Sequence, residues 1–413
     1  MKKTNDERID QTTKKKRLTS NYNHVKIMIG AAFLMATSAI GPGTVTQVAV
    51  FTESLLTSFG FVIIIAALLN IGAQVNIWRI ISVSKMRGQD IANAVLPGLG
   101  YFVTFLIIIG GVAFNMGNLA GAGLGLNALL GIPPNVGASI TAIICIFVFL
   151  SKEAGLAMDF IVRWLGVLMI LLTAYVVFSS NPPIKEAALD AVFPMELSFY
   201  AIITIVGGTV GGFITFAGAH RLLDAGITGQ ENLKKVNKSS ISGIAVTAIM
   251  HILLYLAVLG VVTKGIALDP SNPTASAFFH AAGEVGYRLF GLVLWAAGIT
   301  SAIGAAYTTV SFFTSFHEKL EKYRKLWIII FLASTCTMLI TIGRPVLLLI
   351  LASSFNGIIL PITLLSILLA AHNKKIVGDY KHPVWLTIFG GIVVIVGGYF
   401  SVITLMEEIP KLF

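Results

Sequence analysis

The sequence is poor in charged residues and in cysteine. Only 12% of its 413 residues are Asp, Glu, Lys or Arg, whereas 56% are hydrophobic. Soluble domains carry roughly 25% charged residues, so this composition excludes an ordinary soluble enzyme and indicates a membrane protein. Both cysteines, Cys145 and Cys336, lie inside apolar runs, which excludes a disulfide framework or a metal–thiolate centre and leaves packing as their role.

Catalytic motifs are also missing. The sequence contains no phosphate-binding G-x-x-x-x-G-K-[ST] loop, no nucleophile beside a base, and no cluster of cysteine and histidine. This disfavours an ATP-driven pump or a membrane enzyme. Transport, if this is the function, would have to draw on an ion gradient or on the gradient of the solute itself.

Long apolar runs are what the sequence has in abundance. A hydrocarbon core about 30 Å thick needs about 20 apolar residues per helix, so the runs predict an all-α integral membrane protein with about eleven transmembrane helices. The predicted spans are Val25–Ser58, Phe59–Ser82, Leu99–Leu124, Val136–Leu150, Leu156–Ser179, Leu197–His220, Ile241–Val262, Tyr287–Phe313, Leu326–Ile342, Val346–Ala371 and Val384–Leu405.

The basic residues predict the orientation. The first 24 residues are basic and contain no apolar stretch, so we expect a cytoplasmic tail rather than a cleaved signal peptide or a nucleic-acid patch. Most of the 29 Lys and Arg residues fall in the tail and in alternate loops on its side. By the positive-inside rule, the chain is a multi-pass cell-membrane protein with its N-terminus inside and its C-terminus outside. Its expected partners are the lipid bilayer and a small solute or metal ion, without nucleic acid or an obligatory protein.

Glycine and proline interrupt the first and the sixth predicted spans, at residues 39–44 (AIGPGT) and 207–212 (GGTVGG). One glycine cluster would be explained by close helix packing. Two clusters in equivalent spans instead indicate broken helices lining a site at the bilayer midplane, within a 5+5 inverted repeat. The predicted parts are a tail at 1–24, five-helix repeats at 25–180 and 195–372, and an additional helix at 383–413.

Five stretches match the motifs of one family. They are IGAAFL at 29–34 leading into GPGT at 41–44, Gln74 and Arg79 as Q-x-x-x-x-R, RGQDIA at 87–92, AAG at 296–298 followed by Thr300 and Ser301, and Leu360-Pro361. On these residues the chain resembles the Nramp divalent-metal transporters, which share the leucine-transporter fold. The resemblance covers most of the chain and implies a secondary transporter of metal ions or other cations.

The same resemblance shows departures at the metal ligands of the family. The aspartate and asparagine of D-P-G-N, the methionine and histidine of M-P-H-N, and the glutamine of span ten correspond to Gly41, Thr44, Gly211, Phe213 and Ser353. Thioether and carboxylate ligands are those that suit transition metals, so Mn²⁺ or Fe²⁺ coordination in the family's manner is not expected. A hydrated ion held by hydroxyls and carbonyls stays open, because Mg²⁺ keeps several waters.

Uncharged polar residues and glycines around the breaks are the predicted substrate site: Gly41, Gly43, Thr44, Gln47, Thr209, Gly211, Ser353 and Asn356. Neutral donors and acceptors suit a small polar solute, which gives a second hypothesis, a Na⁺-coupled symporter for a carboxylate or amino-acid-like molecule. Interhelical hydrogen bonding is the equally weighted alternative for each polar side chain. A receptor that no longer transports is a third hypothesis, disfavoured because the chain has no large soluble domain.

Bound Na⁺ is the one cofactor that the sequence suggests. AGITS at 297–301 resembles the A-x-x-T-S pattern of sodium-coupled members of the leucine-transporter fold, and AIGPG at 39–43 resembles their A-V-G-x-G. The resemblance implies ligands from the carbonyls of Thr37, Ile40 and Ala297 and the hydroxyls of Thr300 and Ser301. The alternative is that these hydroxyls bond back to their own helix.

Ionisable side chains are costly inside a membrane, so those within predicted spans are candidates for a function. Asp159 and Arg163 are four residues apart and can pair on one helix face. His251, near the middle of span seven, could either carry protons or make a structural hydrogen bond.

Overall fold

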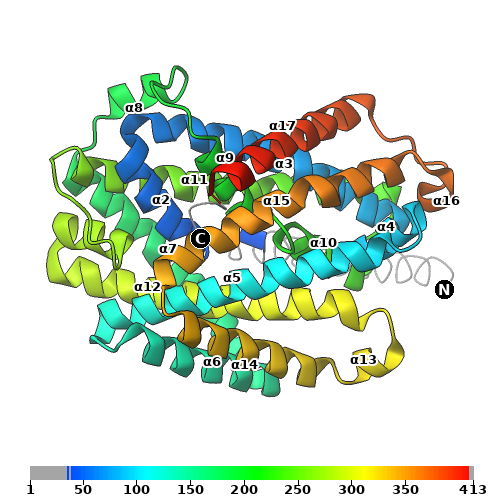
Figure 1. The fold of residues 1–413 in the computed structure, drawn as a ribbon, viewed down its shortest axis with the longest axis horizontal. Coiled ribbons are helices and arrows are strands. Elements are labelled where there is room, and N and C mark those ends of the chain that lie inside the picture. The colour runs from blue at the N-terminus through cyan, green and yellow to red at the C-terminus, as the bar shows by residue number, and fades with distance from the viewer. Residues whose placement is uncertain (1–34, 37–38, 409–413) are drawn as a thin grey trace, which may run out of the picture.

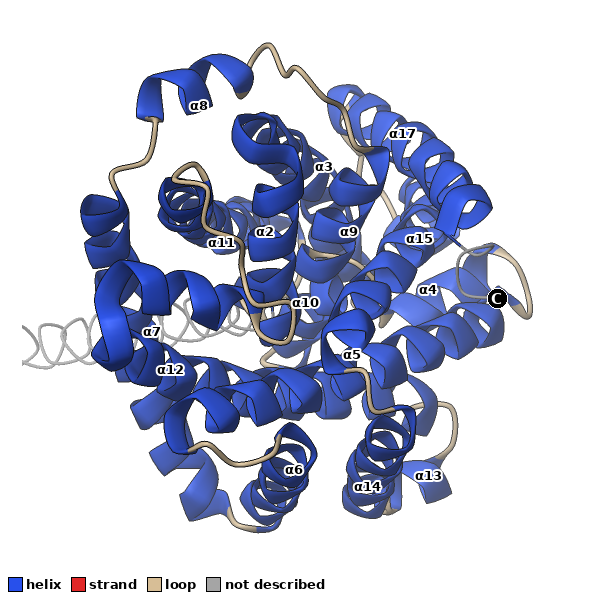
Figure 2. Ribbon diagram, turned by 60° about the vertical axis from the view of Figure 1, so that its left-hand side comes forward, coloured by secondary structure: helices blue, strands red, loops and turns tan. Residues whose placement is uncertain are grey.

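The computed structural model describes residues 35–36 and 39–408, without the side chains of residues 152–163, 405, 407 and 408. The described residues form helices joined by short loops, and none of them is in a strand (Figure 2). The long helices are α2 (Pro42–Leu55), α3 (Phe59–Ser84), α5 (Leu99–Leu130), α6 (Pro134–Leu150), α7 (Lys152–Ser180), α9 (Phe199–Thr209), α10 (Ile214–Asp224), α11 (Leu233–Val262), α12 (Pro273–Thr314), α14 (Arg324–Ile342), α15 (Pro345–Ala371) and α17 (Val384–Glu408).

Short helices occupy the ends of the bundle. They are η1 (Leu56–Ser58), α4 (Gly88–Val95), α8 (Ile184–Asp190), η2 (Gln230–Asn232), α13 (Glu318–Lys322) and α16 (Lys374–Val377). Helices α4, α13 and α16 all lie at one end of the molecule, and α8 lies at the other (Figure 1). Three of the loops that the sequence predicts for the basic side of the membrane therefore share one end.

By length and composition, the described helices give fewer candidate spans than the eleven predicted. By length and apolar composition, eight helices of the described part could cross a membrane, or nine if the bent pair of α7 and α8 is one span. One of the eight is a run of 43 residues, Pro42–Ser84, which is about 65 Å of helix and twice the thickness of a hydrocarbon core. The chain turns inside this run at Leu56, where φ is 48°, so α2 and α3 run in different directions (Figure 1). The count of eleven, like the proposed division into repeats, stays a prediction.

Both predicted helix breaks are present. In the first span, Ala39 is helical, Ile40 lies in a turn, Gly41 is extended (φ −75°, ψ 171°), and α2 begins at Pro42. The Thr44 hydroxyl donates to Ala39 O (2.6 Å) and Gly41 O (3.0 Å), so it binds the carbonyls that the break exposes. In the sixth span, residues 210–213 separate α9 from α10, and Gly212 has a φ of 52° that favours glycine.

The helices around the breaks pack at backbone distance. Gly121 of α5 faces Pro42, and a Cβ atom at Gly121 would overlap the proline ring. A Cβ atom at Gly207 of α9 would likewise overlap the backbone of Ser353 and Gly357 on α15. Small residues thus allow α5 and α15 to enclose the two breaks. Helices α6 and α14 pack against each other on the outside of this centre (Figure 2).

Candidate functional site

Four residues from α2, α9 and α15 come together just beyond the first break. Gln47 Nε2 donates to Leu349 O (3.1 Å), which fixes the Gln47 side chain between α2 and α15. A Cβ atom at Gly208 would lie 3.1 Å from both Gln47 Oε1 and Ser353 Oγ, and one at Gly43 would lie 3.5 Å from Ser353 Oγ. The predicted residues Gly43, Gln47 and Ser353 are therefore neighbours, and the structure adds Gly208 to them.

Asn356 of α15 holds the second break. Its Nδ2 donates to Gly110 O (3.0 Å) and to Ala352 O (2.8 Å), and its own carbonyl accepts from Gly212 N (3.1 Å). Its Oδ1 occupies the space where a side chain on Gly212 would lie, and a Cβ atom at Gly211 would approach the Asn356 carbonyl to 2.6 Å. The predicted residues Gly211 and Asn356 are thus in direct contact.

Two buried amide oxygens at this centre accept no hydrogen bond, Gln47 Oε1 and Asn356 Oδ1. Each side chain is fully buried, and its nitrogen is bound to a backbone carbonyl, so turning the amide over would place oxygen against oxygen. An unsatisfied buried acceptor costs about 1–3 kcal/mol. Acceptors held in this way are suited to a cation or to a solute that brings N–H donors.

Thr209 is placed apart from these residues. Its hydroxyl donates to Ile205 O (2.8 Å) of its own helix. It lines a cavity of about 10 Å³ with Asn70 of α3 and with Thr247 and His251 of α11. In this cavity Asn70 Oδ1 and His251 Nε2 are buried without a hydrogen-bond partner.

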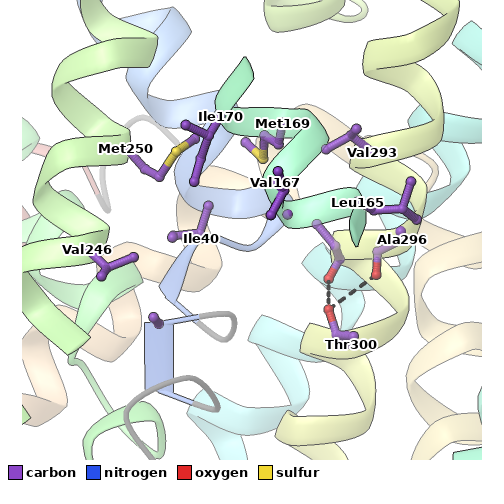
Figure 3. Close-up of a pocket in the computed structure, with 13 residues that line it drawn as sticks. Ile40, Leu165, Val167, Met169, Ile170, Val246, Met250, Val293, Ala296 and Thr300 are labelled. Atoms are coloured by element: carbon purple, nitrogen blue, oxygen red, sulfur yellow. Dashed lines mark hydrogen bonds between the residues drawn. The ribbon is translucent and has the colours of Figure 1, made fainter. Parts of the chain in front are cut away.

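Four of the five predicted sodium ligands lie around the first break, and the fifth, Thr37, is outside the described residues. Ile40, Ala297 and Thr300 line an apolar cavity of about 180 Å³ (Figure 3). The Thr300 hydroxyl donates to Ala296 O (3.2 Å) and Ala297 O (3.0 Å), which is the helix self-bonding that the sequence left as an alternative. Ser301 is fully buried, and its Oγ lies 2.7 Å from where a Cβ atom at Gly41 would be. Whether these atoms hold an ion stays a prediction.

Sequence reasoning missed Asn118 of α5. Its side chain is 1% exposed, both of its amide atoms lack a hydrogen-bond partner, and its Oδ1 lies 3.3 Å from the Cβ position of Gly41. An asparagine within the predicted span Leu99–Leu124 was the available signal. Because Asn118 carries no charge, a prediction based on ionisable groups within spans does not select it.

Contacts close the centre at both ends. At the end with the basic loops, Arg87 forms a salt bridge with Asp224 (2.6 Å), and Gly88 N donates to His220 Nε2 (3.2 Å). Burial raises the pKa of the neighbouring Asp90 carboxyl, and the charge of Arg87 opposes this shift. At the other end, Leu268 N donates to Glu53 Oε1 (2.8 Å). The side chains of Asp159 and Arg163 lie outside the described part, so their predicted pairing stays a prediction.

Metal-binding side chains do not gather in the part of the chain that the structure describes. There, no group of three or more His, Cys, Asp or Glu residues is arranged to hold a metal ion. The polar atoms at both breaks come from amides, hydroxyls and the backbone.

Comparisons with known proteins agree with this architecture. Residues 32–407 match the family model described as natural resistance-associated macrophage protein-like, Nramp. An uncharacterised membrane protein of Bacillus subtilis, YcsG, is 56% identical over 387 residues, which are 94% of this chain and 96% of that protein.

Two solved structures have a similar fold. A crystal structure of a mutant Eremococcus coleocola manganese transporter aligns with a TM-score of 0.69 and 16% identity over 94% of this chain and 88% of that chain. MhsT in complex with L-phenylalanine aligns with a TM-score of 0.66 and 15% identity over 92% and 98% of the two chains. These identities bear on the fold alone, and they confirm the predicted all-α membrane architecture of the leucine-transporter type.

Proposed function

Since this chain belongs to the Nramp family of transporters, we propose that its cargo is a metal ion or a related cation, carried between the two helix breaks. The observation that carries the proposal is the pair of buried acceptors, Gln47 Oε1 and Asn356 Oδ1, held beside the breaks with their nitrogens already bonded. Neutral oxygens suit a hard ion that keeps part of its hydration shell. The manganese transporter of similar fold gives family-level support for a metal cargo.

The membrane and the orientation belong to the same proposal. The protein is a multi-pass membrane protein, and we place it in the cell membrane with its N-terminus inside and its C-terminus outside. The grouping of α4, α13 and α16 at one end supports this orientation, because their loops carry many of the basic residues (Figure 1).

One observation favours a second candidate, Na⁺-coupled symport of a small organic solute such as a carboxylate or an amino-acid-like molecule. The cavity of about 180 Å³ beside the first break is lined mainly by apolar side chains, including Met169, Ile170 and Met250 (Figure 3). An apolar surface does not stabilise a bare ion, whereas it can contact the apolar part of an organic solute. Gly43 and Thr44 lie in the first turn of α2, and backbone amides at the start of a helix would suit a carboxylate.

Thermal-shift and uptake measurements distinguish the two candidates. Purified protein is screened against divalent metals, Na⁺, K⁺ and small carboxylates, because a ligand that binds the folded state raises its apparent stability. Uptake is then measured in proteoliposomes. Cation-dependent stabilisation and uptake without a solute support cation transport, and uptake of a solute that requires Na⁺ supports the second candidate.

Gln47→Leu is the test variant and Gln74→Leu is its matched control. Both glutamines are buried, donate through Nε2 to a backbone carbonyl and have an unpartnered Oε1, but Gln74 of α3 bonds Ser240 O of α11 instead. We expect only Gln47→Leu to weaken ligand stabilisation. Equal effects of the two variants would remove the argument for the site.

A further inference from the structure

Helix α5 passes directly beside the first break. Gly121 packs against Pro42, the first residue of α2, and Asn118 lies one turn earlier on the same helix. This places the Asn118 Oδ1 3.3 Å from the Cβ position of Gly41. A residue from the third predicted span therefore reaches a break that the sequence associated with spans one and eight.

The amide of Asn118 differs from every other amide at the centre. Gln47 and Asn356 each use their nitrogen on a backbone carbonyl, and Asn115, one turn earlier on α5, donates to Thr335 Oγ1 (2.7 Å). Asn118 has neither atom bonded, although its side chain is 1% exposed. A buried carboxamide with both atoms free is costly in a structural role, so it indicates a ligand.

A second side-chain oxygen lies near the point that Asn118 faces. Ser301 Oγ lies 2.7 Å from the same Cβ position of Gly41, on the opposite helix α12. Among the described residues, none donates a hydrogen bond to the carbonyl of Ile40, which the break leaves outside a helix. A hard monovalent ion suits neutral oxygens of this kind, because they carry partial negative charge without a full anion.

We propose that Asn118 is a ligand of a monovalent-cation site at the first break, shared with Ser301 and the Ile40 carbonyl. Its Oδ1 coordinates the ion, and its Nδ2 donates to an oxygen of the cargo or of a water on the ion. The proposal rests on cation binding by this transporter and adds α5 to the helices that form the site. It also gives a reason for glycine at position 41, since any larger side chain would fill the space between Asn118 and Ser301.

Thermal stability of the purified full chain tests the proposal, with NaCl, KCl or choline chloride at one ionic strength and pH. Asn118→Leu keeps the branched shape of the side chain and removes its polar atoms, so it should melt higher than the parent in choline. It should also need at least about tenfold more Na⁺ for the same stabilisation, as expected for the loss of one charge-assisted contact. Asn118→Ala is the second variant, in case leucine prevents folding.

Asn115→Leu is the matched control. It removes a satisfied hydrogen bond from the same helix, so it should melt lower than the parent and keep the Na⁺ response. A parent that transports a cation but is not stabilised by Na⁺ overturns the role of Asn118 and leaves the proposed function intact. An Asn118 variant with the parent's Na⁺ response also overturns the role of Asn118 and leaves the proposed function intact. Asn118-dependent Na⁺ binding in a protein that transports no cation supports the inference and overturns the proposed function.

Discussion

Polar residues at the two breaks have different tasks. Thr44 uses its hydroxyl on the carbonyls of Ala39 and Gly41, so its first role is to hold the shape of the break. Gln47 and Asn356 use only their nitrogens in this way and leave an oxygen unbonded. The predicted binding residues are therefore not equivalent, and single substitutions should separate those that shape the centre from those that contact the cargo.

Manganese should bind weakly. Among the described residues, no group of three or more His, Cys, Asp or Glu side chains is arranged to hold a metal ion, and Mn²⁺ bound without an anionic ligand would leave its charge unbalanced. We expect calorimetry of the purified protein to give no Mn²⁺ binding at micromolar concentrations. Micromolar or tighter binding that Thr44→Ala abolishes would contradict this prediction.

Glycine at the breaks should be required for transport. A Cβ atom at Gly41 would lie 2.7 Å from Ser301 Oγ, and one at Gly211 would lie 2.6 Å from the Asn356 carbonyl. We expect Gly41→Val and Gly211→Val to abolish uptake while the protein still inserts into the membrane. Gly391→Val on α17, where a Cβ atom meets nothing within 4 Å, is the control and should keep parental uptake. Full uptake by both break variants would rule out this location of the site.

Breaks in two helices could be predicted from the sequence because glycine and proline determine them locally. Pro42 lacks an N–H donor, and Gly212 has a φ of 52° that other residues rarely adopt, so both breaks contain residues that favour an interruption whatever the rest of the fold. The approach of Asn118 to Gly41 could not be predicted, because it depends on how α5 packs against α2. The separation of Thr209 from Gln47 is of the same kind, since it depends on the direction of one side chain at the end of α9.

The loop before α17 should make stability depend on pH. His382 bonds Asn76 Oδ1 (2.8 Å) and Tyr380 OH (3.1 Å), and the Tyr380 hydroxyl accepts from Arg79 Nε (3.0 Å). Burial, with smaller contributions from Arg79 and His372, lowers the pKa of His382 to about 4. The unfolded chain binds this proton at about pH 6.5, so the folded state should lose stability as the pH falls from about 6.5 to about 4.

Melting temperatures across this pH range test the prediction. His382→Gln keeps a side chain that can hydrogen bond but does not titrate, so its stability should depend less on pH than that of the parent. His280→Gln is the control for a histidine outside this network. A parallel decline in the parent and in His382→Gln would show that other groups cause it.

A closed centre has to open to one end at a time if the molecule transports by alternating access. Residues 41–49 of the first break and of α2 are all buried, and polar contacts bind the helices together at each end. At the end with the basic loops, Arg87 and Gly88 contact Asp224 and His220 of α10, the half of the broken sixth span nearer that end. Glu53 binds α2 to the segment before α12 at the other end. These contacts are few, as expected of contacts that must break in each cycle.

Charge exchange between Arg87 and Asp224 tests whether this pair holds one end closed. The two side chains are 17% and 39% exposed, and a pair of this exposure contributes at most about 1 kcal/mol, which is about a fivefold change in a two-state equilibrium.

The native cysteines are both buried, so a single cysteine introduced as Ser353→Cys can report access to the centre from the end with the basic loops. We expect Arg87→Asp to raise its labelling rate by about fivefold, because two like charges then face each other. Adding Asp224→Arg restores the pair with its charges exchanged and should return the rate to that of the parent. An exposed pair at the opposite end, Glu284 with Arg288, is the control, and its disruption by Arg288→Asp should leave labelling unchanged. If Arg87→Asp raised the labelling rate and adding Asp224→Arg failed to lower it again, the effect would come from Arg87 alone. The pair would then not be what holds this end closed.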